Sequence, residues 1–171
     1  MLSEKLQNAI NEQINAEFYS AYLYLAMAAY LEDINLPGFA HWMRIQYEEE
    51  IFHALKFFDF LVDRGGRVVL KGIDAPPTAW DSVQHVFENA LEHEQYVTSL
   101  IYQLYQLAKE EGDYPTEVLL QWFITEQVEE EKNAGDAIQQ LRMIGDFGPG
   151  LLAMDREMAA RPPMSAEAPA A

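Results

Sequence analysis

Four glutamates and one histidine lie at positions of long helical segments where hydrophobic residues are expected. These residues are Glu17, Glu50, His53, Glu94 and Glu130. Each falls on the three- and four-residue spacing that defines the apolar face of a helix, the face that normally packs against a core. Burial of an unpaired carboxylate costs on the order of several kcal/mol, and the group usually takes up a proton instead. The pattern therefore predicts a bound cation that the chain itself does not supply.

The spacing of these residues is typical of metal ligands. Glu50 and His53 are three residues apart, the Glu-x-x-His spacing that lets two side chains of one helix bind one ion. Seven residues turn a helix by about 700°, so Glu17 lies within roughly 20° of the apolar residues seven positions before and after it. The same holds for Glu94 and Glu130, each near the middle of its segment. Mid-helix positions on four helices can converge on one site.

A single inward glutamate usually pairs with Lys or Arg, or lies at the solvated edge of its helix. The whole set favours a metal site, because Lys56 and Lys132 point off the shared face and Lys109 lies near a helix end. Two divalent ions would offset four carboxylates beside a neutral histidine. Carboxylates with one imidazole suit iron(II) and manganese(II) and are poor ligands for copper(I), while zinc would act as an inhibitor. We expect Glu50 to bridge the two ions.

The composition excludes several other classes of protein. The 171 residues include 11 Lys and Arg against 28 Asp and Glu, a net charge of −17, which argues against nucleic-acid binding and favours cationic partners. The chain has no cysteine, so any metal must be bound by oxygen and imidazole. The N-terminal residues lack an apolar signal core, and no uncharged run approaches about 18 residues. We therefore expect a soluble, cytoplasmic protein without a membrane segment.

The hydrophobic periodicity predicts an all-α fold with four long helices and a short fifth one. The expected helices span residues 2–33, 37–64, 83–111, 116–145 and 147–158. The first and third connections are about five residues long, which makes the helices they join antiparallel, whereas the second spans about sixteen. Sixteen extended residues reach roughly 53 Å, more than the roughly 42 Å of a 28-residue helix, so this connection is one long crossover. We expect one domain over residues 1–158 and a disordered tail over 159–171.

Four segments carry a more specific pattern. They are NAEFYSAYLY (15–24), EEEIFHA (48–54), LEHE (91–94) and QWFITEQVEEEK (121–132). In these segments, and over nearly its whole length, the chain resembles the bacterial non-haem ferritins. The resemblance implies a ferritin-like four-helix bundle with one long crossover between helices two and three, which agrees with the periodicity.

The resemblance also implies an iron site and an activity. The implied ligands are Glu17, Glu50 and His53 for the first iron and Glu50, Glu94 and Glu130 for the second. A third, weaker iron site is implied at Glu49, Glu126 and Glu129 with Glu130. Ferroxidase activity is implied, in which O2 or H2O2 oxidises Fe(II) to Fe(III), and the ferric mineral is stored in a hollow shell of 24 identical subunits.

Residues around the expected centre have more than one interpretation. Tyr24 lies one helical repeat from Glu17, so its hydroxyl can bond a ligand carboxylate and, by resemblance, supply an electron, but it is equally a plain core tyrosine. Gln127 is expected to orient a ligand, and Trp122 is either a redox neighbour or a packing residue. Similar haem-bearing bacterioferritins carry a second Glu-x-x-His and a methionine haem ligand, whereas this chain has Gln127 to Glu130 in the corresponding stretch and Ile51 between Glu50 and His53. Haem is therefore not expected through Ile51, and a haem at another site stays open.

Residues away from the centre suggest contacts between subunits. We interpret His41, His85 and His93 as ordinary surface or edge histidines. Apolar residues off the inward faces need partners, namely Tyr22, Tyr30, Trp42 and Phe58. The apolar run at 67–70 is a candidate short strand that pairs with a neighbouring subunit, and the fifth helix is expected at a four-fold axis. An acidic group at Glu110, Glu111, Asp113 and Glu117 either lines a three-fold entry channel or is simply solvated.

Two other functions remain open at this stage. A non-storage di-iron oxidoreductase that detoxifies peroxide would turn over without retaining a mineral. A purely structural helical oligomer would bind no stoichiometric iron. Retention of iron inside a large particle after oxidation distinguishes the three.

Overall fold

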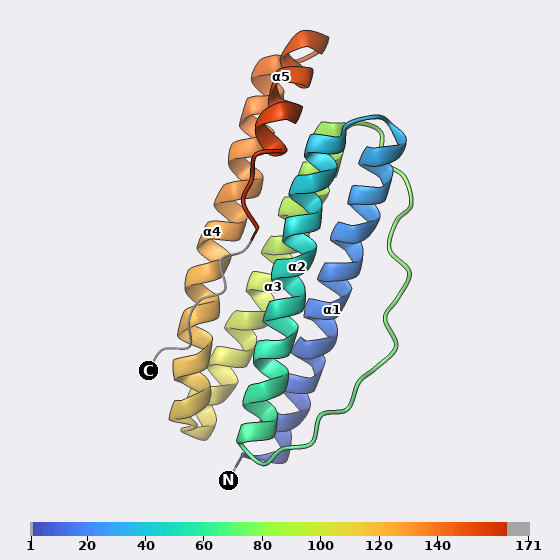
Figure 1. The fold of residues 1–171 in the computed structure, drawn as a ribbon. Coiled ribbons are helices and arrows are strands. Elements are labelled where there is room, and N and C mark those ends of the chain that lie inside the picture. Colours follow the sequence, from blue (N-terminus) through green and yellow to red (C-terminus); the bar gives the residue numbers. More distant parts are fainter. Residues whose placement is uncertain (1, 164–171) are drawn as a thin grey trace.

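The chain forms five helices and no strand within residues 2–163, the part that the computed structural model describes. They are α1 (Glu4–Asp33), α2 (Pro37–Asp63), α3 (Val83–Glu111), α4 (Tyr114–Ile144) and α5 (Gly148–Met158). The all-α fold and the number of helices predicted from the periodicity are confirmed. Figure 1 shows α1 to α4 side by side as a bundle, with α5 at one end.

The turn between α3 and α4 is shorter than predicted. Gly112 ends α3 in the left-handed conformation, with φ at 64°, which glycine adopts without strain. Asp113 then caps α4, because its side chain accepts a hydrogen bond from the backbone N–H of Thr116 at 3.1 Å. The predicted start of α4 at Thr116 was therefore wrong by two residues. Pro115 lies in the first turn of α4, where a helix needs no N–H donor.

The four long helices run up, down, down, up, the arrangement that two antiparallel connections and one long crossover produce (Figure 1). Residues 34–36 join α1 to α2 and residues 112–113 join α3 to α4, so each pair forms an antiparallel hairpin. The connection from α2 to α3 runs the length of the bundle beside α1, as the green trace in Figure 1 shows. One long crossover is thus confirmed.

Side chains of α1 hold the crossover. The backbone N–H of Arg67 donates to Gln7 Oε1 at 2.8 Å, and Asn11 donates to the Arg67 carbonyl at 3.0 Å. Asn11 also accepts from the N–H of Val69 at 2.7 Å. Gln7 and Asn11 are one helical turn apart on the same face of α1, so residues 67–69 lie extended along that helix. The predicted pairing of this run with a neighbouring subunit stays a prediction.

The bundle has two apolar clusters separated along its axis. The cluster nearer α5 contains Phe39 and Phe87, whose ring centroids are 5.9 Å apart. The other contains Phe57 and Phe123, which stack at 4.0 Å and 15°. On every long helix, the polar residues singled out in the sequence lie between the stretches that supply these clusters. A polar layer thus interrupts the core.

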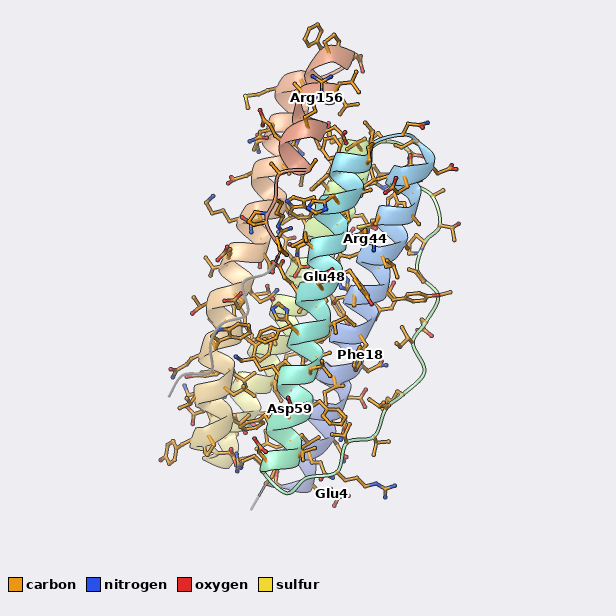
Figure 2. The ribbon with its side chains drawn as sticks, viewed as in Figure 1. Glu4, Phe18, Arg44, Glu48, Asp59 and Arg156 are labelled. Carbon is orange, nitrogen blue, oxygen red and sulfur yellow. The ribbon has the colours of Figure 1, made fainter. Side chains whose placement is uncertain are left out.

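One apolar residue expected to need an outside partner is buried within the subunit. Trp42 is only 8% exposed and packs on the ring of Phe87 at 5.1 Å, so its assignment off the inward face was wrong. Tyr22 is 48% exposed, as expected for a residue that contacts another subunit. Figure 2 shows the exposed side of α2, which carries Arg44, Glu48 and Asp59.

The fifth helix docks on the start of α2. Asp155 Oδ1 accepts hydrogen bonds from the backbone N–H groups of Gly38 at 2.9 Å and Phe39 at 3.0 Å, which caps α2 from a distant part of the chain. After α5, the side chain of Arg161 contacts α2, while Ala159, Ala160, Pro162 and Pro163 are exposed. The disorder predicted for 159–163 stays a prediction. The disorder predicted for the remaining tail falls on 164–171, outside the described residues. None of the helices described is long and apolar enough to cross a membrane.

Candidate metal centre

The five inward residues predicted from the sequence lie in the polar layer of the bundle. Their exposed fractions are 1% for Glu17, 2% for Glu50, 3% for His53, 1% for Glu94 and 6% for Glu130. Each of the four long helices therefore brings one of these carboxyl groups into the interior, and α2 adds the imidazole. Burial of four carboxyl groups in one layer is costly unless cations or protons accompany them.

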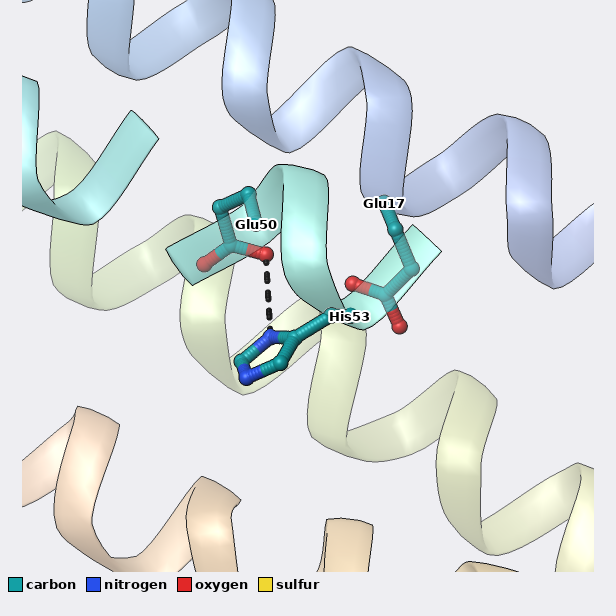
Figure 3. A group of neighbouring side chains, drawn as sticks. All are labelled: Glu17, Glu50 and His53. Atoms are coloured by element: carbon teal, nitrogen blue, oxygen red, sulfur yellow. Dashed lines mark ion pairs between the residues drawn. The ribbon is translucent and has the colours of Figure 1, made fainter. Parts of the chain in front are cut away.

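Two groups of side chains have the spacing that a metal ion requires. Ligand atoms of Glu17, Glu50 and His53 all lie within 4.8 Å of one another, and so do those of His53, Glu126 and Glu130. Figure 3 shows the first group, with Glu17 on α1 reaching toward Glu50 and His53 on α2. His53 Nδ1 is 3.4 Å from Glu50 Oε2. Because His53 belongs to both groups, the two candidate ion positions are adjacent.

Glu94 is close to this centre but is held by its own hydrogen bonds. The Tyr24 hydroxyl donates to Glu94 Oε1 at 2.5 Å, and Gln127 donates to Glu94 Oε2 at 3.2 Å. Gln127 also bonds Thr98 at 3.1 Å, which fixes its amide. Both residues thus contact a candidate ligand, in the places where the sequence suggested such contacts. Among the described residues, Glu94 is part of neither group with ligand spacing.

The residues expected to form a third site are only partly brought together. Glu126 lies with Glu130 in the second ligand group. Glu49 is partly buried and Glu129 exposed, and the charge of Glu129 contributes to raising the pKa of Glu49. Neither of these two belongs to a ligand group among residues 2–163, and Glu49 is paired with Arg161.

Two glutamines that sequence reasoning gave no role orient the candidate ligands. Gln13 donates to Glu17 Oε1 at 2.8 Å, and Gln46 donates to Glu130 Oε2 at 2.8 Å. Both are buried, at 3% and 0% exposure. Helical spacing could have identified both as inward residues, because each lies four residues before an inward glutamate of its helix and so on the same face.

Several buried oxygen atoms of the centre lack a partner. Within residues 2–163, no hydrogen bond reaches Glu17 Oε2, Glu50 Oε1 or Gln46 Oε1. Buried polar atoms are nearly always hydrogen-bonded, so such atoms need an explanation. The carboxylate oxygens of Glu17 and Glu50 face the layer where ligand spacing is found, and a hard divalent cation is the partner that such oxygens prefer.

The electrostatics of the centre also indicate a cation site. Burial raises the pKa of Glu17 to about 7, assisted by the charge of Glu94 and opposed by the hydrogen bond from Gln13. Burial, followed by the neighbouring carboxylates, holds the pKa values of Glu50 and Glu130 well above their ordinary value. Without a metal, protons must replace the missing positive charge at neutral pH. A metal that binds here displaces those protons.

His53 is available as a neutral ligand. Burial lowers its pKa to about 4, and the positive charge of Lys56 lowers it further in the same direction. The imidazole packs edge-on against the rings of Trp122 at 5.5 Å and Phe123 at 5.7 Å. A neutral ring nitrogen can bind a metal, and the aromatic packing fixes the plane of the ring.

Comparison with known proteins agrees with this arrangement. A family model described as a ferritin-like domain matches residues 7–144. This chain belongs to the ferritin family. Iron storage is the function that this membership supports, and ferroxidase activity is characteristic of the family.

Individual ferritins match over most of their length. A bacterial non-haem ferritin of Bacteroides fragilis strain 638R is 45% identical over 148 residues, which covers 86% of this chain and 93% of that protein. One from Staphylococcus saprophyticus is 43% identical over 161 residues, covering 94% and 96%. Among solved structures, an open-pore ferritin of the archaeon Archaeoglobus fulgidus has a TM-score of 0.94 at 49% identity, covering 95% of this chain and 99% of that one. An engineered closed form of the A. fulgidus ferritin has a TM-score of 0.95 at 49% identity, covering 96% and 100%.

The other histidines of this ferritin lie outside the two ligand groups. His85 is exposed, and a ring nitrogen of His41 lies 2.9 Å from the carbonyl oxygen of Arg161. His93 is partly buried, its ring lies 2.7 Å from the Ser20 hydroxyl, and burial lowers its pKa to about 4. The interpretation of these three as surface or edge residues agrees with their positions, although His93 is more enclosed than a surface histidine.

Proposed function

We propose that this ferritin oxidises Fe(II) at a two-iron centre and stores the product as a ferric mineral. The proposed ligands are Glu17, Glu50, His53, Glu94 and Glu130. The observation that supports the proposal best is the pair of adjacent ligand groups that share His53, together with the unpartnered buried oxygens of Glu17 and Glu50. A protein that only needed a stable core would have apolar residues at these positions.

The donor set suits the proposed reaction. Carboxylate oxygens stabilise Fe(III) more than Fe(II), so binding of an iron pair favours its oxidation. Each of two Fe(II) ions gives up one electron, and the pair reduces O2 to H2O2 or, with H2O2 as the oxidant, reduces peroxide to two waters, with two protons taken up in either case. Glu94 reaches the second iron position once it exchanges a hydrogen bond from Tyr24 or Gln127 for the metal.

A third iron position is proposed on the side of α4. Its ligands would be Glu49, Glu126 and Glu129 with Glu130, of which Glu126 and Glu130 already share a ligand group. This position would receive Fe(III) from the two-iron centre before the ion moves on to the mineral. Tyr24 is proposed to influence the oxidation through its hydrogen bond to Glu94.

We propose that the chain assembles into a shell of 24 identical subunits. Exposed apolar residues, among them Tyr22 at 48%, Tyr96 at 56% and Leu70 at 65%, support an assembly that covers them. The crossover supports it too, because Val69, next to Leu70, is 49% exposed. We also propose a cytoplasmic location.

Oxidation followed by particle analysis tests the function. Metal-free protein is loaded with two Fe(II) per subunit without oxygen, then given O2 or H2O2, and the iron is followed by absorbance and by size-exclusion chromatography. We expect fast oxidation and iron that elutes with the large particle. Glu17→Ala with Glu50→Ala should abolish the fast phase, while Glu12→Gln, an exposed change on the same helix, should not. Unchanged oxidation in the double variant would rule out this centre.

A non-storage enzyme that detoxifies peroxide is the second candidate. The same ligand groups would support it, because the chemistry at the iron pair is the same. It predicts oxidation with H2O2 but release of the ferric product into solution. Iron that leaves the particle after each cycle would favour this candidate over storage.

A further inference from the structure

Arg161, which follows α5, reaches back into the bundle. Its backbone belongs to the short segment 159–163, which descends from α5 between α2 and α4 in Figure 1. Its Nη2 atom lies 2.7 Å from Glu49 Oε2, and both side chains are only 17% exposed. A charge-assisted contact of this length between two mostly buried groups is a strong one.

Other contacts hold the guanidinium in this place. It lies over the ring of Trp42, 4.4 Å from the ring centroid, and Nη1 is 3.4 Å from the Trp42 carbonyl oxygen. The Arg161 carbonyl oxygen is 2.9 Å from His41 Nε2. Stacking on an aromatic ring and a fixed backbone both restrict the arginine, so the ion pair with Glu49 is positioned by its surroundings.

The charge of Arg161 acts on the carboxylates proposed to bind iron. Burial raises the pKa of Glu49, and Arg161 is the largest influence in the opposite direction. Arg161 also lowers the pKa of Glu130, although more weakly than burial and the neighbouring carboxylates raise it. For Glu17, Glu50, Glu94 and Glu130, the ion pairs found within residues 2–163 include no Lys or Arg partner. The positive charge at Glu49 is therefore one that the chain supplies.

We propose that Arg161 is a tethered cation that competes with iron for Glu49. While the guanidinium is bound, Glu49 cannot complete the third iron position, and an arriving ion must displace it. The segment 159–163 thereby limits how readily iron occupies the third position, which lies between the two-iron centre and the stored mineral on the path of the iron. This inference rests on the proposed function, since it concerns the third position of the same site.

Anaerobic calorimetry on the assembled, metal-free protein tests the proposal. Fe(II) is titrated at pH 7.5 into the wild type, Arg161→Gln, Arg161→Lys and the control Arg156→Gln, which removes an exposed charge of α5. We expect two tight ions per subunit in all four proteins. Arg161→Gln should bind the third ion at least about tenfold more tightly than the wild type, because the competing charge-assisted contact with Glu49 is lost. Arg161→Lys should fall between them, because lysine keeps the charge but loses the planar stacking on Trp42.

The outcomes separate this inference from the function on which it rests. If the wild type binds no tight pair, the proposed function fails and the inference with it. If the pair binds normally and Arg161→Gln binds the third ion equally or more weakly, only the inference is overturned. Crystals loaded with Fe(II) give a second readout that involves no turnover: Arg161 should have left Glu49 wherever iron occupies the third position. An intact Arg161–Glu49 pair beside a bound third ion contradicts the proposal.

Discussion

Replacement of Glu17 by Gln tests whether the buried carboxyl groups destabilise the metal-free protein and whether bound metal offsets that loss of stability. Glu17 is 1% exposed, and burial raises its pKa from the ordinary 4.5 to about 7. The carboxyl group of Glu17 therefore stays protonated to higher pH in the folded, metal-free protein than in the unfolded chain. The group lowers the free energy of unfolding as pH rises from 4.5, and the full loss is present above pH 7. Glutamine carries no such charge, and its amide oxygen can still accept the hydrogen bond from Gln13.

The expected size follows from the pKa difference. At 1.36 kcal/mol per pKa unit, the metal-free Glu17→Gln protein should be more stable than the wild type by about 3 kcal/mol at pH 8 and by about 1 kcal/mol at pH 5. For a chain of this length this is a rise of roughly 6–12 °C in melting temperature at pH 8. Thermal unfolding of both proteins at the two pH values, after removal of metal with a chelator, measures it.

Iron should reverse the order of stability. With two Fe(II) per subunit and no oxygen, the wild type gains binding energy that the variant, which lacks one ligand oxygen of the first group, largely loses. Glu12→Gln on the exposed side of α1 is the matched control and should change little in either state. A metal-free variant that is less stable than the wild type at pH 8, or a difference that does not shrink toward pH 5, would refute the reasoning.

Three further predictions concern the same layer. His53→Ala should weaken binding of the iron beside Glu17 and Glu50 at least about tenfold in anaerobic calorimetry, because a neutral imidazole offers one lone pair to one ion, and unchanged binding of both ions would contradict its role as a ligand. Tyr24→Phe should slow oxidation in stopped-flow absorbance, because Glu94 loses the hydrogen bond that orients its carboxylate while Gln127 gives way to the metal, whereas the exposed control Tyr22→Phe should leave the rate unchanged; equal rates in both would remove Tyr24 from the reaction. Iron binding at pH 7 should release protons, seen as a dependence of the calorimetric heat on the buffer, because the pKa values of the buried carboxyl groups are raised, and heats that are independent of the buffer would show that these groups are already ionised.

Helical periodicity predicted the architecture and the direction of each inward side chain. Seven-residue spacing placed Glu17, Glu94 and Glu130 on buried faces, and the structure has all three at 6% exposure or less. Loop lengths predicted the single crossover for an equally simple reason, the reach of an extended chain. The start of α4 was misplaced, because Asp113 caps a helix whose first turn contains Pro115, whereas the sequence prediction left residues 112–115 outside the helices.

Periodicity could not predict which oxygen meets which partner. Glu94 faces the interior as expected, but its hydrogen bonds to Tyr24 and Gln127 depend on rotamers and on helix packing. The bond from Gln46 to Glu130 joins two helices, and no spacing within one helix predicts it. Arg161 gave no signal at all, because its segment has no repeat and contacts residues more than a hundred positions earlier in the chain.

Anomalous X-ray scattering from crystals soaked anaerobically with Fe(II) tests the two-iron centre most directly. Data collected on either side of the iron absorption edge locate iron atoms without reference to activity. The account predicts two neighbouring peaks per subunit, one among Glu17, Glu50 and His53 and one beside Glu130, with the formerly unpartnered oxygens of Glu17 and Glu50 now bound to metal. Fully loaded crystals with no iron peak among these side chains would contradict it.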